Sequence, residues 1–209
     1  MIFFLFVYIS LAGYGVDFSQ YHDASTLSCL VQNGYSFAIP RCYCSIGAVD
    51  DNCAVNIGNS HAAGMSRVDA YFFPCYYCGN VAGQVDSFWD YTVSNQLQFT
   101  RLWFDVEGEW SSSYSENQNF LMQMMEEARA IGIVSGIYCS QYYWGSFFGD
   151  YYYPYVSEHP VWYAHYDYDD SFSDYYNGYD FGGWSDPQIK QYQGTTSYCG
   201  ASIDLNYEG

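Results

Sequence analysis

The run of residues 99–108 constrains the fold of this chain more than any other part of the sequence. Its centre, residues 102–104, is Leu-Trp-Phe, three consecutive bulky apolar side chains typical of a parallel strand that is buried on both faces. Asp105 and Glu107 follow directly. Side chains two apart in a strand point the same way, with alpha carbons about 6.6 Å apart. The sequence therefore predicts two carboxylates on one face at the carboxyl end of a buried strand.

Two neighbouring carboxylates are costly in a partly desolvated site, because like charges raise the pKa of at least one of them. Glycoside hydrolysis uses such a pair, with one acid protonated and its partner ionised. The alternative is that Asp105 and Glu107 lie on a solvated turn, the commoner place for acidic side chains. The rest of the chain has to decide between these two interpretations.

Seven further strands are predicted, at residues 13–21, 36–41, 67–73, 133–139, 161–166, 188–192 and 202–207. Helices are expected between the early strands, at residues 25–33, 53–63, 79–95 and 115–131. The last of these helices would begin at a Ser115-x-x-Gln118 capping box. Residues 166–186 are expected to form one long surface loop. This order predicts an α/β fold with a parallel sheet, closed into a modified TIM-type (β/α) barrel of about eight strands with fewer helices in the C-terminal part.

A barrel of this kind gathers the carboxyl ends of its strands on its active face. Asp17, Asp105, Glu107 and Asp204 all lie at or near strand ends in this assignment. The first and eighth strands become neighbours when the barrel closes, so Asp17 and Asp204 are expected to be close. This convergence favours an acidic active site, although Asp17 and Asp204 could instead only cap loops.

Composition limits the possible partners. The chain has 209 residues and a net charge of −18, with only five Lys and Arg, and 22% of its residues are aromatic, including 26 Tyr. Nucleic-acid binding is excluded because phosphate contacts need clustered cations, and an anionic membrane surface is disfavoured for the same reason. Residues 13–209 are expected to form a single domain and a monomer, with no metal and no cofactor.

Residues 1–12 are predicted to be a signal peptide. They are almost entirely apolar but too short to span a bilayer, and Ser10-x-Ala12 supplies the small residues that precede a cleavage site. The alternative is a buried first strand or helix. A signal peptide implies a protein that is secreted or delivered to the lumen of a phagosome-like or lysosome-like vacuole, with no membrane attachment after cleavage.

Eight cysteines in an exported chain predict disulfides, although the sequence does not determine which cysteines pair. A four-cysteine zinc site made by Cys42, Cys44, Cys75 and Cys78 is a less favoured alternative, because the spacing of the first pair is unusual for zinc. A redox role for Cys75-x-x-Cys78 is weaker still.

Six short motifs together resemble a known enzyme family. They are Gly15-Val16-Asp17-Phe18-Ser19, Asp105-Val106-Glu107, Gly136-Ile137-Tyr138, Trp162-Tyr163-Ala164-His165-Tyr166, Gln191-Tyr192 and Ile203-Asp204-Leu205-Asn206. In this order and spacing the chain is similar to glycoside hydrolase family 25, the Chalaropsis-type or phage-type lysozymes, and in particular to the protozoan and nematode branch. Many nematode members lack the Asp-x-Glu, which this chain keeps.

The resemblance implies a modified barrel that cuts the β-1,4 bond between N-acetylmuramic acid and N-acetylglucosamine in bacterial peptidoglycan. Glu107 matches the family's general acid. Asp105 matches the carboxylate that stabilises an oxazolinium formed by the substrate's own N-acetyl group. Asp17 and Asp204 match the flanking acids that position water, substrate and the general acid.

Aromatic side chains are assigned to the sugar groove by the same resemblance. Tyr138 and Tyr166 match groove positions. Phe72 on the third strand is predicted to bind substrate as well, although none of the six motifs contains it. Both tyrosines could instead be core residues with satisfied hydroxyl groups. His165 and Trp103 are expected to serve packing.

Two other functional classes stay open at this stage. A non-catalytic glycan-binding barrel is one. A chitinase-like glycosidase is the other, disfavoured because that family has a further Asp where this chain has Trp103. For the enzyme, the net charge predicts best activity at acidic pH, because bacterial walls are also anionic.

Overall fold

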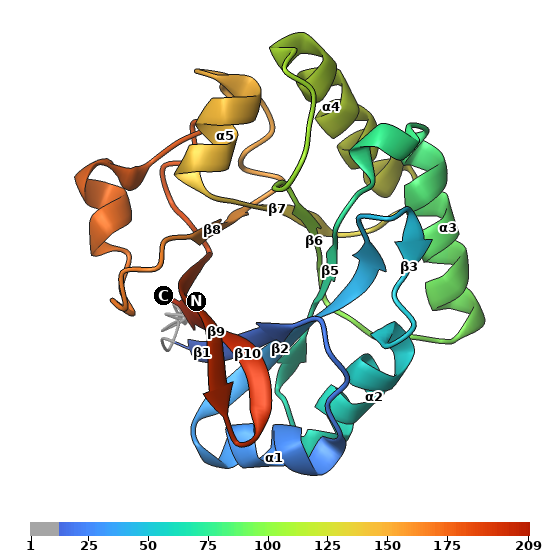
Figure 1. The fold of residues 1–209 in the computed structure, drawn as a ribbon, viewed down its shortest axis with the longest axis vertical. Coiled ribbons are helices and arrows are strands. Elements are labelled where there is room, and N and C mark those ends of the chain that lie inside the picture. Colours follow the sequence, from blue (N-terminus) through green and yellow to red (C-terminus); the bar gives the residue numbers. More distant parts are fainter. Residues whose placement is uncertain (1–12) are drawn as a thin grey trace, which may run out of the picture.

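The computed structural model describes residues 13–209 and shows a closed barrel with helices around it (Figure 1). The signal-peptide prediction falls on residues 1–12, outside the described residues. Hydrogen bonds from β1 to both β2 and β10 close the ring. In order around the barrel, the strands are β1 (Gly13–Phe18), β2 (Tyr35–Cys44), β5 (Ala70–Phe72), β6 (Leu102–Asp105), β7 (Ser135–Cys139), β8 (Val161–Ala164), β9 (Ile189–Tyr198) and β10 (Ala201–Glu208).

The predicted barrel is confirmed, but its sheet is mixed rather than parallel. The strands from β1 to β9 pair in parallel around the ring, whereas β10 is antiparallel to both of its neighbours. The reason is the two-residue turn between β9 and β10, where Cys199 and Gly200 both have positive φ. Such a turn makes a tight hairpin, and a parallel partner would need a much longer crossover. Two short strands lie beside β2, β3 (Ala48–Val49) and β4 (Arg67–Val68).

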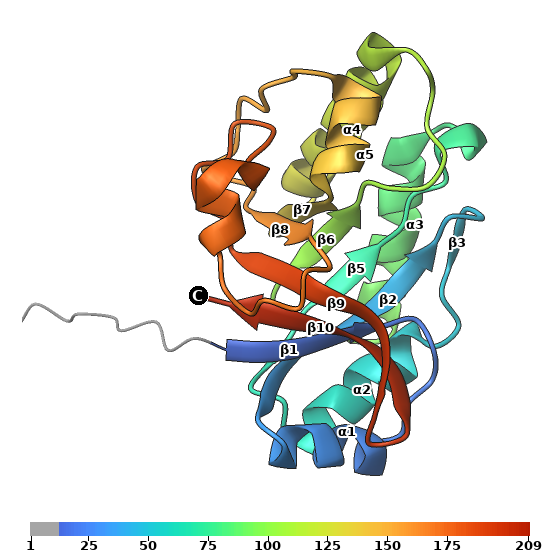
Figure 2. The ribbon, with the colours of Figure 1, turned by 60° about the vertical axis from the view of Figure 1, so that its left-hand side comes forward.

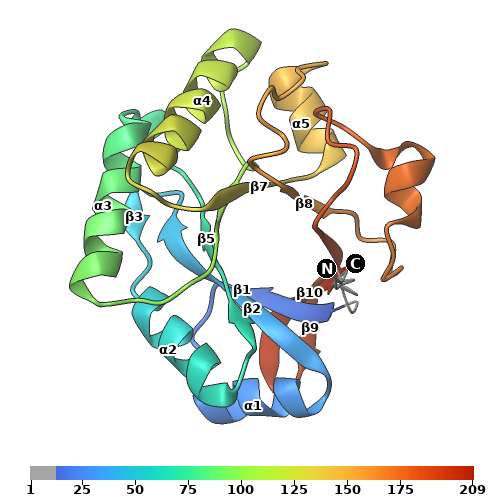
Figure 3. The same ribbon diagram turned by 180° about the vertical axis from the view of Figure 1, so that it is seen from behind.

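Five α-helices surround the barrel, as Figure 3 shows from behind. They are α1 (Ala24–Gln32), α2 (Cys53–Ala63), α3 (Val81–Ser94), α4 (Tyr114–Ala130) and α5 (Gln141–Phe148). The capping-box prediction for α4 is wrong, because the N-cap is Ser113, two residues earlier: its hydroxyl accepts the Glu116 N–H, but its own N–H bonds to the Ser111 hydroxyl and not to Glu116. Between α5 and the C-terminus only the single turn η2 (Tyr175–Tyr179) is helical, so the C-terminal part is indeed helix-poor. No helix within residues 13–209 is long and apolar enough to cross a membrane.

The side chains of β6 separate two cores. Trp103 is fully buried inside the barrel, whereas Leu102 and Phe104 pack between the barrel and its helices. Room for the Trp103 indole comes from Gly136 on β7, because a Cβ at that position would lie 2.5 Å from the ring. The inner cluster therefore fills the barrel beneath the ends of its strands. Its buried members are Phe37, Ile39, Trp103, Tyr138, Trp162, Ala164 and Ile189.

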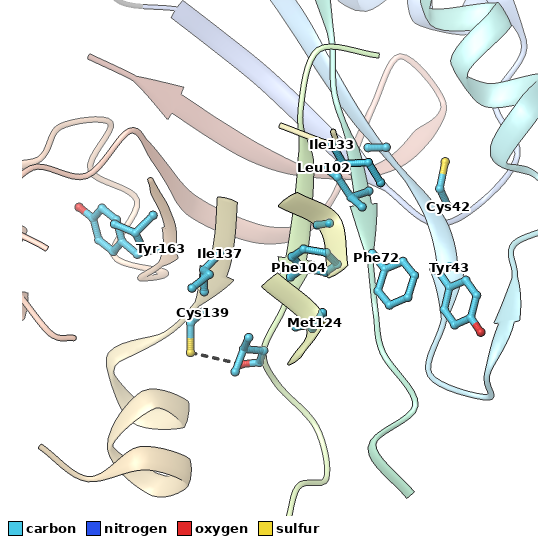
Figure 4. Packing of buried hydrophobic residues seen from close by; sticks show 14 of the residues in the cluster. Cys42, Tyr43, Phe72, Leu102, Phe104, Met124, Ile133, Ile137, Cys139 and Tyr163 are labelled. Atoms are coloured by element: carbon cyan, nitrogen blue, oxygen red, sulfur yellow. Dashed lines mark hydrogen bonds between the residues drawn. The ribbon is translucent and has the colours of Figure 1, made fainter. Parts of the chain in front are cut away.

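Phe72 belongs to the outer core, so its assignment to the substrate groove is wrong. Its ring stacks on Tyr43 with 4.2 Å between centroids and meets Phe104 edge-on at 5.4 Å, and it is fully buried (Figure 4). Val68, Ala70 and Phe72 all pack toward the helices. Since side chains alternate along a strand, the other set, which includes Tyr71, turns into the barrel.

The described residues contain three disulfides, Cys29–Cys199, Cys42–Cys53 and Cys75–Cys78. The prediction of disulfides is confirmed for these six cysteines, whereas Cys44 and Cys139 are free thiols. Cys139 is buried on β7, with its Sγ 3.2 Å from the Val106 carbonyl oxygen (Figure 4). The four-cysteine zinc alternative fails, because three of its four sulfur atoms are already in disulfides.

The Cys29–Cys199 disulfide joins α1 to the tip of the β9–β10 hairpin. Figure 2 shows this hairpin reaching down beside α1. The bond links residues 170 apart in the chain, so it closes most of the described fold into one covalent loop. Cross-links of this length restrict the unfolded chain strongly.

Candidate active site

The four predicted acids meet in one hollow at the carboxyl end of the parallel strands. The hollow has a volume of about 90 Å³. Tyr138 and Tyr166 also line it, but Phe72 does not, and Tyr71 from the same strand takes its place. The complete lining consists of Asp17, Tyr71, Asp105, Glu107, Tyr138, Trp162, Tyr166, Gln191 and Asp204.

β6 and the loop after it supply Asp105 and Glu107. Asp105 is the last residue of β6 and has the same inward direction as Trp103, which leaves it only 4% exposed. The Val106 N–H donates to the Tyr138 carbonyl oxygen at 2.9 Å, which continues the ladder beyond the end of the strand. The side chain of Val106 is buried on the outer side, so that of Glu107 faces the hollow again. The alternation predicted from the sequence is confirmed.

Asp17 and Asp204 face the first pair from β1 and β10. They are direct partners in the β1–β10 register, as their predicted proximity requires. Asp204, however, is not at the carboxyl end of its strand but at the fourth of eight positions in β10. It reaches the mouth of the barrel because β10 runs antiparallel to β1.

Hydrogen bonding divides the four acids into two kinds. Asp17 Oδ2 accepts from Gln191 Nε2 at 2.8 Å and from Asn206 Nδ2 at 2.7 Å. Asp204 accepts from Gln191 Nε2 at 3.2 Å and from the Thr195 backbone N–H.

The carboxyl groups of Asp105 and Glu107 have no such support. Within residues 13–209, neither carboxyl group has a hydrogen-bond donor, and Asp105 Oδ1 is buried without a partner. Asp17 and Asp204 are therefore anchored, whereas Asp105 and Glu107 are left free to hold or release a proton.

The electrostatics of the hollow favour retention of protons. Burial raises the pKa of Asp105 well above its usual value, and the charges of Glu107 and Asp17 raise it further. Burial and then the charge of Asp204 raise the pKa of Glu107. The pKa of Asp17 is also raised, first by burial and then by Asp204, while its two amide donors act in the opposite direction. Four acids this close titrate as a coupled group that holds at least one proton over a wide pH range.

Aromatic side chains and one amide complete the walls. The Tyr138 and Tyr166 hydroxyls both donate to Gln191 Oε1, at 2.7 and 2.8 Å. Tyr138 is also part of the inner core. It therefore matches the alternative prediction, a core tyrosine whose hydroxyl group is hydrogen-bonded. Tyr166 is 54% exposed and offers its ring at the mouth.

Sequence reasoning overlooked Gln191, Tyr71, Trp162 and Asn206 as site residues. Asn206 anchors the site from behind, with its Oδ1 accepting the Trp162 indole N–H at 2.8 Å. Trp162, Gln191 and Asn206 lie within the six motifs, and this position in the sequence could have identified them. Tyr71 could have been found only by knowing which face of its strand turns inward.

Among the described residues, one group outside the hollow has the composition of a metal site. Ligand atoms of His165, Asp167 and Asp174 lie within 4.8 Å of one another. The fully buried Lys190, however, already places its Nζ 2.8 Å from Asp167 and 3.0 Å from Asp174. The His165 ring stacks on Tyr179 with 3.9 Å between centroids, which confirms its expected packing role. The group is thus a partly exposed ion-pair cluster that already contains its cation, the buried Lys190.

This arrangement is suited to acid–base chemistry on a neutral polar substrate. A proton on the Asp105–Glu107 pair lies opposite two anchored carboxylates, and a half-exposed aromatic ring flanks the opening. Paired carboxyl groups with different environments are what the cleavage of a glycosidic bond requires.

Comparison with known proteins points to the same chemistry. A family model described as "Lysozyme-like protein 1" matches residues 10–192. The chain is 39% identical over 206 residues to a probable GH family 25 lysozyme 2 of Dictyostelium discoideum, covering 98% of this chain and 95% of the relative. It is 37% identical over 203 residues to lysozyme-like protein 5 of Caenorhabditis elegans, covering 95% and 93%.

The fold is shared with a solved structure as well. A GH25 lysozyme from Aspergillus fumigatus superposes with a TM-score of 0.76 at 14% identity, over 95% of this chain and 94% of that one. At 14% identity the structural likeness supports the barrel fold only. The family assignment rests on the sequence matches given above. The chain therefore belongs to the glycoside hydrolase family 25 lysozymes.

Proposed function

We propose that this protein is an exported N-acetylmuramidase that hydrolyses the β-1,4 bond between N-acetylmuramic acid and N-acetylglucosamine in bacterial peptidoglycan. The observation that carries the proposal is the Asp105–Glu107 pair. Both carboxyl groups lack donors, both have raised pKa values, and both open into the same hollow. The names of the relatives, which are lysozymes, support the choice of substrate.

In the proposed mechanism, the Asp105–Glu107 pair carries one proton, because burial and the charges of neighbouring acids raise the pKa values of both groups. Glu107, the less buried of the two, presents this proton to the glycosidic oxygen and acts as general acid. Proton transfer breaks the glycosidic C–O bond and leaves the leaving sugar neutral, while positive charge develops at the anomeric carbon. Water then bonds to that carbon and returns a proton to the Glu107 carboxylate. The Asp105 carboxylate, which no donor neutralises, is placed to stabilise that charge electrostatically.

The other two acids orient the reactants. Asp17 and Asp204 each keep oxygen lone pairs free to accept from a sugar hydroxyl or from the attacking water, because their donors come from the protein side. The anchors hold both groups rigidly, which lowers the entropic cost of reaching the reactive geometry.

The surroundings of the hollow suit a polymer that continues on both sides. A neighbouring hollow of about 230 Å³ shares Asp17, Tyr71 and Asp204 with the first and adds small polar side chains, among them Ser19 and Thr195. Beyond Glu107, a third hollow of about 250 Å³ is lined by Gly108, Glu109 and an aromatic wall from residues 73–77. A glycan strand lying across the acids would therefore find room at either end.

The two alternative functions are less compatible with these residues. A barrel that only binds glycan gains nothing from Asp105, whose buried and unpartnered carboxyl group costs stability. The position where a chitinase-like enzyme would have a further acid is occupied by Trp103, which fills the barrel interior.

Export is part of the proposal. The short apolar run of residues 1–12 is typical of a signal peptide. The three disulfides of the described chain suit an oxidising compartment. A secreted protein or one in the lumen of a phagosome-like vacuole satisfies both observations, and there the substrate would be bacterial walls.

The test compares the wild-type protein with Glu107→Gln on purified peptidoglycan and on a bacterial suspension. The wild type should release reducing ends and lower turbidity. The rate of the variant should be lower by a factor of at least about 100, which is the smallest contribution typical of general acid catalysis. Glu126→Gln, an exposed position on α4, is the matched control and should retain wild-type activity. Binding without release of reducing ends, unchanged in Glu107→Gln, would instead support the glycan-binding alternative.

A further inference from the structure

The side chain of Gln191 links all the anchored groups of the site. It lies on β9, is 2% exposed, and contacts two acids and two tyrosines. We propose, building on the function above, that Gln191 is a positioning residue for the reaction: its amide holds Asp17 and Asp204 in place and favours their charged forms against the burial that opposes them, which shifts the catalytic proton toward the Asp105–Glu107 pair.

Every hydrogen-bonding position of this amide is used. Its oxygen accepts from the Tyr138 hydroxyl at 2.7 Å and from the Tyr166 hydroxyl at 2.8 Å. Its nitrogen donates to Asp17 Oδ2 at 2.8 Å and to Asp204 Oδ2 at 3.2 Å. A glutamine amide offers two lone pairs and two N–H groups, and all four are engaged here.

The orientation of the amide follows from its partners. If the amide were flipped, Oε1 would face two carboxylate oxygens and no donor would remain between them. The two tyrosine hydroxyls thus hold Gln191 in the orientation in which both N–H groups point to the acids. Tyr138 is packed in the inner core, so the hydroxyl that donates to Gln191 Oε1 is held in a fixed position.

The consequence is an uneven distribution of protons. Burial raises the pKa values of both Asp17 and Asp204, and donation from Gln191 Nε2 acts against this rise because it favours their ionised forms. Their negative charges in turn act on the other pair, because Asp204 raises the pKa of Glu107 and Asp17 raises that of Asp105. One neutral amide therefore favours negative charge on the Asp17–Asp204 side of the hollow and, through that charge, a proton on the Asp105–Glu107 side.

The other titratable groups around Gln191 do not provide this function. Tyr71 on β5, Tyr138 on β7 and Tyr166 after β8 have raised pKa values, caused first by burial, so they stay neutral near physiological pH. The one positive charge that lowers the pKa of Asp105 is Arg41 on β2, and it is already paired with Asp50 at 2.6 Å. Lys190, beside Gln191 on β9, bonds to the ion-pair cluster instead.

The test is the pH profile of kcat/KM for three variants. In Gln191→Leu both donors are lost, so Asp17 and Asp204 protonate more readily and the acidic limb moves up by about one pH unit. Glu107 then loses part of the charge that raises its pKa, so the alkaline limb moves down and the profile narrows.

The pH profile of Gln191→Glu should differ from that of Gln191→Leu, although glutamate has the same shape as glutamine. A fifth carboxylate facing the acids raises the pKa values of all four, so both limbs move to higher pH. Gln193→Leu, on the same strand and without a hydrogen bond to any of the four acids, is the control and should leave both limbs in place.

If Gln191 had only a structural role, its substitution would lower kcat/KM at every pH and leave the acidic and alkaline limbs of the pH profile at the same pH. That result in both Gln191 variants would overturn the inference. If Gln191→Leu does not fold, as judged by its near-ultraviolet circular dichroism, the isosteric Gln191→Glu decides alone.

Carboxyl-carbon NMR titration of the wild type and Gln191→Glu gives a second readout that needs no activity. Higher titration midpoints for Asp17 and Asp204 in the variant are expected, and unchanged midpoints would contradict the inference. If the wild type is inactive on peptidoglycan, the proposed function fails by itself, and this titration still decides about Gln191.

Discussion

Glu107→Gln should make the protein more stable at neutral pH while it removes activity. The folded chain raises the pKa of Glu107 above its unfolded value, chiefly by burial and then by the charge of Asp204. A raised pKa means that folding favours the protonated form. The stability that this group contributes is therefore fully present below its unfolded pKa of about 4.5 and is lost as pH rises through the folded value.

The neutral amide that this substitution introduces would not titrate, so the variant avoids that loss. Each pH unit by which the Glu107 pKa is raised corresponds to about 1.4 kcal/mol of unfolding free energy. For a chain of this length, 1 kcal/mol shifts Tm by about 2–4 °C, so each unit corresponds to roughly 3–5 °C. The general-acid step should at the same time slow by about 10²–10⁴.

Thermal unfolding followed by circular dichroism from pH 4 to pH 8 measures this difference directly. The Tm of Glu107→Gln should match the wild type at pH 4 and exceed it increasingly toward pH 8. Glu126→Gln, an exposed substitution of the same kind, should show no such trend. A variant that melts at or below the wild-type temperature at pH 8 would refute the idea that folding raises the pKa of Glu107.

Three further predictions follow from charge, covalent links and packing. Activity on whole walls should be highest at acidic pH and should rise with added salt at pH 7, because the net charge of −18 repels an anionic wall; a flat or alkaline optimum contradicts this. Cys29→Ser with Cys199→Ser should lower the unfolding free energy by up to about 5 kcal/mol in denaturant titrations. Phe72→Ala should cost about 3–5 kcal/mol in the same titrations yet leave the KM unchanged, whereas a raised KM would return Phe72 to the groove.

Most of the site could be predicted because strand alternation and barrel closure are simple geometric rules. The spacing of Asp105 and Glu107 placed both side chains on one face, and closure brought Asp17 beside Asp204. The direction of β10 could not be predicted, since it depends on a two-residue turn with positive φ at Cys199 and Gly200. Asp204 therefore lies beside Asp17 as predicted, although its strand runs in the direction opposite to the predicted one.

The error at Phe72 has a different physical cause. Along residues 67–73, Val68, Ala70 and Phe72 turn outward to the helices and the polar side chains between them turn inward, because this barrel has a partly polar interior. Asp69, for example, is buried and accepts the Trp103 indole N–H at 2.9 Å. Helix α5 was overlooked because its sequence is aromatic and apolar on most faces and lacks a clear helical period. The Cys29–Cys199 pair could not be predicted because it depends on a contact between residues 170 apart in the chain.

The chemistry of the product tests the central claim most directly. Purified peptidoglycan is digested with the wild type, the new reducing ends are reduced with borodeuteride, and the labelled sugar is identified by mass spectrometry. Cleavage through Glu107 predicts label in the alcohol of muramic acid, with none above background in Glu107→Gln. Label in the alcohol of glucosamine, or equal labelling with the variant, would contradict the account.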